Sequence, residues 1–214
     1  MSASPDPQAA PRARRWSLIR SLTLADFVTL GNATCGVLAI FAALEFVDSG
    51  NPSTAWLALA LVPAAGVADF LDGRIARRSR RQSVLGADLD SLADLLSFGM
   101  APAAIAFALG LKGGWDKAIL VYFVCCGLSR LARFNVTAAE LSDATGKVRY
   151  FEGTPIPSTV LLVLVLALLQ ASGLVGSNLP FGVVNLGWEL HPISFLFAAS
   201  GSAMISKRLR VPKF

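Results

Sequence analysis

Residues 54–94 read TAWLALALVPAAGVADFLDGRIARRSRRQSVLGADLDSLAD, and this stretch contains the pattern that decides the fold. An apolar segment ends in Asp69 and Asp72, a basic connection follows, and the next apolar segment begins with Asp90 and Asp94. A charged side chain in hydrocarbon costs at least about 2.5–3.5 kcal/mol on insertion scales. The sequence therefore predicts helices that enter a membrane and carboxylates that serve a site there.

The composition of the whole chain agrees with a membrane protein. Of its 214 residues 54% are hydrophobic and 15% charged, and the mean hydropathy is +0.59. Apolar segments long enough to cross a hydrocarbon core of about 30 Å recur along it. We therefore expect an all-α, polytopic integral membrane protein with six transmembrane helices. The expected spans are Leu24–Phe46, Thr54–Ala76, Leu85–Leu109, Lys117–Asn135, Ser158–Leu174 and Leu186–Ile205.

The ends of the chain differ from this membrane domain, which we place at residues 23–206. Residues 1–22 comprise a disordered tail and a juxtamembrane amphipathic segment in this interpretation. The first dozen residues are rich in Ser, Pro and Ala, which predicts the tail, and Arg14–Leu24 predicts the amphipathic helix. Residues 207–214 form a basic cytoplasmic tail in this interpretation.

Lysine and arginine placement orients the predicted bundle. Of the 19 basic residues, 17 lie at the two ends or near the connections between spans two and three and between spans four and five. The opposite connections contain Lys112 and Lys117. By the positive-inside rule both termini and the carboxylates face the cytoplasm, so we expect a multi-pass protein of the cell membrane. Membrane topology also explains the net charge of +5 without nucleic acid.

Helical periodicity predicts which polar residues converge. Asp69, Asp72, Gly73, Ala76 and Arg77 share one face of the second span, because residues three and four apart lie on the same side. On the third span, Gly86, Asp90 and Asp94 form a similar stripe. The short connection makes the two spans antiparallel neighbours.

Asp88 points to the far side of the third span in this registration. We expect it to be a solvated residue at the helix start, where a negative charge favours the helix dipole. The site therefore comprises four aspartates and excludes this fifth one.

Converging carboxylates need cations, and oxygen ligands favour Mg²⁺ or Mn²⁺. Four carboxylates suit two such ions. The single histidine, His191, falls near the outer end of the sixth span, so we expect a mechanism that runs without histidine. Gly73, Ala76 and Gly86 either leave room for a ligand or simply let helices pack closely.

The spacing D-x-x-D-G-x-x-A-R-x8-G-x3-D-x3-D from Asp69 to Asp94 resembles the signature of the CDP-alcohol phosphotransferases. The resemblance implies a membrane enzyme that transfers a substituted phosphoryl group from a CDP-linked donor to an alcohol and releases CMP. It also implies a homodimer. The implied metal ligands are Asp69, Asp72, Asp90 and Asp94, with Asp94 also serving as the catalytic base.

The resemblance further implies a pocket for the CDP-lipid, formed by Asn32, Asp69, Gly73, Ala76, Arg77 and Gly86. An alternative for Arg77 is one more charge that orients the protein in the membrane, since three further arginines follow it closely.

Other segments look like the phosphatidylserine synthases within this family: Thr29–Asn32, Ser97–Pro102, Arg130–Asn135 and Phe151–Pro157. This likeness implies CDP-diacylglycerol as donor and L-serine as acceptor. We expect Arg130, Arg133 and Asn135 to bind the acceptor carboxylate and Phe151–Pro157 to cap the pocket.

Three alternatives remain open. The acceptor could be glycerol phosphate, inositol phosphate or another alcohol. A cation transporter also needs intramembrane carboxylates, but we see no internal repeat, and the acids lie away from the middle of the membrane. A purely structural membrane protein leaves the four aspartates unexplained.

Overall fold

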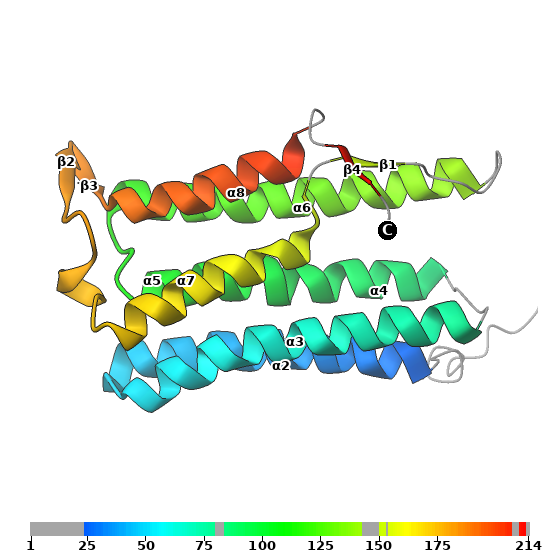
Figure 1. The fold of residues 1–214 in the computed structure, drawn as a ribbon, viewed down its shortest axis with the longest axis horizontal. Helices are drawn as coiled ribbons and strands as arrows, with labels where there is room; N and C mark the ends of the chain where they lie inside the picture. The colour runs from blue at the N-terminus through cyan, green and yellow to red at the C-terminus, as the bar shows by residue number, and fades with distance from the viewer. Residues whose placement is uncertain (1–23, 80–83, 143–149, 153, 207–209, 213–214) are drawn as a thin grey trace, which may run out of the picture.

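Long helices lie side by side along one axis in the computed structural model, which describes residues 24–79, 84–142, 150–152, 154–206 and 210–212 (Figure 1). The expected disordered tail at residues 1–22 lies outside the described residues, as does the expected amphipathic helix except for Leu24. Of the expected basic tail, residues 210–212 are described.

The first two helices form an antiparallel pair. Helix α2 (Leu24–Ser49) ends where Gly50 adopts φ 66°, a left-handed conformation that glycine allows, and the Gly50 amide donates to the Phe46 carbonyl at 2.9 Å. Asn51 then caps α3 (Pro52–Ser79) by accepting from the Ser53 amide at 3.0 Å. This tight turn packs α2 along α3.

The third helical segment is continuous but irregular. It comprises α4 (Val84–Asp94), a π-helical stretch (Leu95–Met100) and α5 (Ala101–Ala108). A π-helical stretch inside an α-helix often marks a functional site, and this one begins directly after Asp94. The segment therefore changes its helical register between the carboxylates and α5.

The remaining helices are one long and two short. Helix α6 (Gly114–Ser142) packs against α8 (Phe195–Ile205), and α7 (Val160–Ala171) packs against α3. Single 3₁₀ turns at Ile156–Thr159 and Pro192–Ser194 lead into the two short helices. A further 3₁₀ turn spans Gly176–Asn178.

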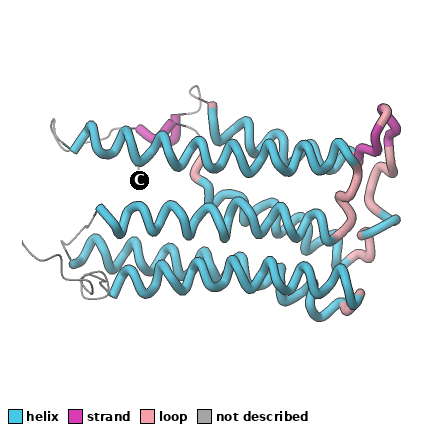
Figure 2. Tube along the Cα trace, turned by 180° about the vertical axis from the view of Figure 1, so that it is seen from behind, coloured by secondary structure: helices cyan, strands magenta, loops and turns pink. Residues whose placement is uncertain are grey.

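Two short antiparallel strand pairs complete the described chain. Strand β1 (Tyr150–Glu152) pairs with β4 (Arg210–Pro212), so part of the expected tail is a strand, while β2 (Val184–Leu186) pairs with β3 (Trp188–Leu190). Seen from behind, the β2–β3 hairpin projects at one end of the bundle (Figure 2).

Four helical segments in the described residues, rather than the expected six, are long and apolar enough to cross a membrane: Asp26–Ser49, Pro52–Arg74, Gly86–Ala108 and Gly114–Val136. The other two apolar helices, Ile156–Ala171 and Pro192–Ile205, are shorter than a standard span. The structure thus confirms a mostly helical chain with several candidate membrane spans, and it does not confirm the number six.

The expected start of the sixth helix at Leu186 is wrong. Gly187 adopts φ 80° between β2 and β3, and Pro192 begins the turn that precedes α8. The apolar residues of this stretch therefore form a hairpin and not a helix, because a glycine turn and a proline interrupt them.

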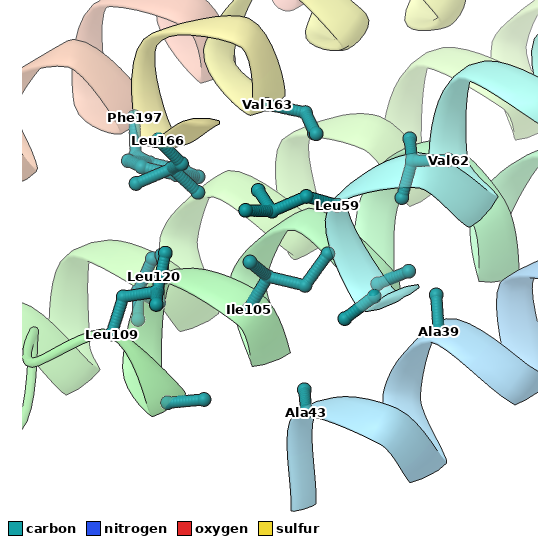
Figure 3. Close-up of a cluster of buried hydrophobic side chains, with 14 of the residues drawn as sticks. Ala39, Ala43, Leu59, Val62, Ile105, Leu109, Leu120, Val163, Leu166 and Phe197 are labelled. Atoms are coloured by element: carbon teal, nitrogen blue, oxygen red, sulfur yellow. The ribbon is translucent and has the colours of Figure 1, made fainter. Parts of the chain in front are cut away.

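The hydrophobic core lies between the helices (Figure 3). Ala39 and Ala43 on α2 face Leu59 and Val62 on α3, and Ile105 on α5 is also buried in this cluster. Small alanine side chains let α2 approach its neighbours closely. This packing holds α2 and α3 together.

Candidate active site

Three carboxylates from two antiparallel helices meet at one place. Asp69 and Asp72 lie on α3, one turn apart, and Asp90 lies on α4. One oxygen atom from each residue lies within 4.8 Å of the other two. Helix α2 packs against both α3 and α4, and the predicted convergence of these three aspartates is present.

Asp94 extends this group by one helical turn on α4. Its carboxyl group is buried and interacts electrostatically with Asp69, Asp90 and Asp72. Arg130 on α6 provides an opposing charge, since its guanidinium interacts favourably with Asp94. The site therefore places four acidic groups together with one arginine.

Helix α2 supplies two buried side chains that hold these carboxylates. The Thr29 hydroxyl donates to Oδ2 of Asp72 at 2.9 Å, and Nδ2 of Asn32 donates to Oδ1 of Asp94 at 3.3 Å. Both residues lie on one face of α2, three positions apart. Asn32 was predicted to bind the CDP-lipid, and in the described structure its amide contacts a site carboxylate.

The role of Thr29 was not predicted. It belongs to the Thr29–Asn32 segment that resembles the phosphatidylserine synthases, and it lies three positions before Asn32, on the same helix face. That spacing is a signal that could have identified it as a partner of the site.

The π-helical stretch is held against α2 and against the 3₁₀ turn Ile156–Thr159, which precedes α7. The Ser97 hydroxyl donates to the Asn32 carbonyl at 2.9 Å, and the Thr159 hydroxyl donates to the Phe98 carbonyl at 2.8 Å. A Cβ atom on Gly36 would lie 2.9 Å from Cα of Ser97, so only glycine permits this approach. These contacts fix Asp94, which directly precedes the stretch.

The donor set fits divalent cations. All nearby acidic ligands are carboxylate oxygens, the type that Mg²⁺ and Mn²⁺ prefer. Oδ1 of Asp90 is buried and has no hydrogen-bond partner among the described residues, which leaves it available to a cation. Without bound cations, the repulsion among four carboxylates beside a single arginine is electrostatically unfavourable.

The three predicted acceptor residues on α6 have different surroundings. Arg130 is half-buried beside Asp94, and its Nε atom has no hydrogen-bond partner among the described residues. Asn135 instead accepts from the Ser91 hydroxyl at 3.0 Å and donates to Oδ1 of Asp88 at 3.4 Å. Arg133 is half-buried. Asn135 thus links α6 to α4.

Asp88 is exposed and lies outside the three-carboxylate group, as its helical position predicts. Gly73 and Gly86 are half-buried on the helices that carry the aspartates. Ala76 and Arg77 lie within α3, but their side chains are outside the described part of the structure. Within the predicted cap Phe151–Pro157, Gly153 is also outside the described residues.

His191 lies at the other end of α6 from Arg130, as expected for the outer end of the bundle. Its Nδ1 atom is 2.6 Å from Oδ2 of Asp116, in the first turn of that helix. The described carboxylate site therefore has no histidine.

Comparisons with known proteins identify the family of this chain. Residues 22–198 match the family model described as CDP-alcohol phosphatidyltransferase. A Saccharomyces cerevisiae protein named CDP-diacylglycerol–serine O-phosphatidyltransferase is 47% identical over 202 residues, which cover 92% of this chain and 73% of that protein.

Relatives from other lineages have the same name. The Mycobacterium leprae protein is 33% identical over 198 residues, which cover 91% of this chain and 59% of that protein. The Methanocaldococcus jannaschii protein is 32% identical over 164 residues, which cover 77% of this chain and 70% of that protein. The chain thus spans about three fifths of the length of the mycobacterial relative. Because the family model covers most of the sequence, this chain belongs to the CDP-alcohol phosphatidyltransferase family.

Proposed function

We propose that this chain transfers the phosphatidyl group of CDP-diacylglycerol to the hydroxyl of L-serine, giving phosphatidylserine and CMP. The observation that carries the proposal is the convergence of Asp69, Asp72 and Asp90, with Asp94 and Arg130 beside them. The names of the relatives supply the donor and the acceptor.

The transfer forms one bond and breaks one. The serine hydroxyl oxygen bonds to the phosphorus of the phosphatidyl group, and the bond from that phosphorus to the bridging diphosphate oxygen breaks, so that CMP leaves. Asp94 accepts the hydroxyl proton as the base. Its position one turn beyond Asp90 and next to Arg130 supports this role.

Asp69, Asp72, Asp90 and Asp94 would hold two Mg²⁺ or Mn²⁺ ions in this proposal. Such ions, when bound, neutralise phosphoryl oxygens and the leaving group. The protein contributes the alignment of the carboxylates, which Thr29 and Asn32 support through their hydrogen bonds.

The two substrates would approach from different sides. Asn32, Asp69, Gly73, Ala76, Arg77 and Gly86 would contact the CDP-lipid. The Oδ1 atom of Asn32 is buried and has no hydrogen-bond partner among the described residues, so it can accept a bond from the nucleotide. Arg130 and Arg133 would bind the serine carboxylate, with Asn135 holding α6 against α4, and Phe151–Pro157 would cap the pocket.

The membrane arrangement belongs to the same proposal. All six apolar helices would cross the cell membrane, with the bilayer adjusting to α7 and α8, and both termini and the site would face the cytoplasm. The family resemblance supports a homodimer.

The test is an acceptor panel. Purified protein is mixed with CDP-diacylglycerol in detergent micelles, with Mn²⁺ or Mg²⁺, and CMP release is measured with L-serine, glycerol phosphate or inositol phosphate. Among the three acceptors, we expect only L-serine to drive CMP release, with phosphatidylserine as the product. We expect no CMP release after a chelator removes the cations. Release with glycerol phosphate or inositol phosphate but not serine would refute the acceptor assignment.

A further inference from the structure

The connection between α7 and α8 has an unusual composition for a loop. Residues 172–191 contain one formally charged side chain, Glu189, and include the β2–β3 hairpin at the end of the bundle away from β1 and β4 (Figure 1). Loops that face water are generally polar. This segment therefore calls for an apolar environment.

The hairpin is fixed to the start of a candidate membrane span. Asp116, fully buried in the first turn of α6, accepts from the amides of Gly113 and His191, each at 2.9 Å, and its Oδ2 atom also contacts Nδ1 of His191. Nε1 of Trp115 donates to the Leu186 carbonyl at 3.1 Å. The candidate span begins at Gly114, so the hairpin lies at the depth where that span begins.

Close packing supports the same placement. A Cβ atom on Gly114 would lie 2.8 Å from Cγ of Trp188, and the rings of Trp115 and Trp188 are 5.7 Å apart. The hairpin thus rests directly on the helix backbone and cannot move away from it without losing these contacts. Its polar anchors point into the protein and leave its apolar side chains outside.

The outward side of the segment is apolar and unusually exposed. Phe181 is 82% exposed, Trp188 62% and Leu186 61%, and Val183 and Val184 are exposed as well. Exposed apolar side chains also lie on the adjoining helices, including Trp115 and Val121 on α6 and Phe195 and Leu196 on α8. The hairpin and the helices that it joins therefore both expose apolar surface. A lipid environment covers both without a separate partner.

We propose that residues 181–188 lie in the interfacial layer of the leaflet opposite the aspartates, where they anchor the ends of α6 and α8. Aromatic side chains are enriched at this layer because they are apolar at one end and can hydrogen-bond at the other. The open edges of a two-stranded hairpin also need water, which the hydrocarbon core does not provide. The partner is therefore the headgroup region, not the core.

Anchoring the hairpin sets the depth of the catalytic end. Arg130 lies 14 residues after Asp116 on the same helix, about 21 Å along its axis. Fixing the first turn of α6 at one boundary of a hydrocarbon core of about 30 Å therefore places Arg130 in the opposite leaflet, roughly 9 Å from the other boundary.

Site-directed spin labels test the proposal in vesicles of phosphatidylcholine and phosphatidylglycerol. Labels are placed at V183C and L186C in full-length protein whose Cys35, Cys125 and Cys126 are replaced by alanine and whose fold is verified by CMP release. D48C, exposed at the same end of the bundle, is the aqueous control, and L164C on α7 is the hydrocarbon control. Collision rates with oxygen and with a water-soluble nickel chelate report the depth of each label.

We expect the hairpin labels to fall between the two controls, with at least about threefold less nickel collision than residue 48 and less oxygen collision than residue 164. Nickel collision equal to that of residue 48 would place the hairpin in water and overturn the proposal. Oxygen collision equal to that of residue 164 would place it in the core, and shielding from both reagents would indicate a protein partner. Either result also overturns it.

A second measurement retains the native cysteines. Vesicles contain lipids brominated either near the headgroup end or near the middle of the acyl chains, and the fluorescence quenching of the unmodified protein is compared with that of W188F. Shallow bromines should quench the Trp188 contribution more strongly than deep ones. Absent quenching, or stronger quenching by deep bromines, would contradict an interfacial position.

Discussion

Among single residues, Asp90 and Asp94 differ from Asp88 by the face of α4 on which they lie, and Asp69 and Asp72 join them from α3. Asp69, Asp72 and Asp90 have mutually close oxygens and Asp94 is buried beside them, whereas Asp88 is exposed. We expect each site Asp→Asn substitution to lower the rate of CMP release at least about 100-fold, because losing a cation ligand removes several kcal/mol of charge stabilisation.

The matched control for this series is D88N, which should retain at least about half of the activity. Activity with saturating CDP-diacylglycerol and serine is the measurement, and detergent gel filtration verifies folding. An equally severe loss in well-folded D88N would show that the assigned helix faces are wrong.

Thr29 is a residue whose effect should appear in cation binding. Its hydroxyl donates to Asp72, so T29V removes an orienting hydrogen bond while nearly preserving side-chain shape. Loss of such a partner typically weakens metal affinity about 10- to 100-fold. We expect this weakening in Mn²⁺ titrations followed by electron paramagnetic resonance, and recovery in T29S. Unchanged Mn²⁺ affinity in T29V would contradict the positioning role.

The site residues were predictable to different degrees for a physical reason. Asp69 and Asp72 lie three positions apart on α3, and Asp90 and Asp94 four positions apart on α4, so helical geometry alone places each pair on one face of its helix. Thr29 is 43 residues from Asp72 in the chain, and its contact depends on how α2 packs. Sequence periodicity has no information on that packing.

At the scale of elements, the contact between α2 and the π-helical stretch decides how the site closes. In G36A the new methyl group would meet the backbone of Ser97 at 2.9 Å, so one of the two helices must shift. Such overpacking usually costs about 1–3 kcal/mol. We expect G36A to lower the thermal unfolding temperature in detergent and to reduce CMP release.

Gly31 provides a control on the same helix, since a Cβ atom there would meet nothing within 4 Å. G31A should leave the unfolding temperature unchanged or raise it, because alanine favours a helix over glycine. Equal behaviour of G31A and G36A would show that the close approach at Ser97 has no energetic importance.

Elements were predicted well where a long apolar run had no interruption. The first four expected spans correspond to long helical segments, including the third with its change to π-helical geometry. The sixth was misplaced because Val184, Leu186 and Leu190 are apolar in either a strand or a helix. Only the conformation of Gly187 and the contacts to α6 distinguish the two.

At the scale of the whole molecule, the two ends of the bundle have different chemistry. One end has the carboxylates, and the sequence segments that adjoin it contain most of the basic residues, while the other end has the apolar hairpin and the buried Asp116–His191 pair. This asymmetry is what the positive-inside rule uses to orient a membrane protein. By this rule we expect the aspartates to face the cytoplasm and the α2–α3 turn to lie on the opposite side.

Cysteine labelling on intact cells tests this orientation. In the cysteine-free protein, a membrane-impermeant maleimide added outside should label D48C, in the last turn of α2, and should not label R80C until the cells are permeabilised. Labelling of R80C but not D48C in intact cells would reverse the orientation. It would also put the proposed serine site on the side of the membrane away from the cytosolic substrate. The same result would therefore contradict both the proposed orientation and a reaction at the cytoplasmic surface.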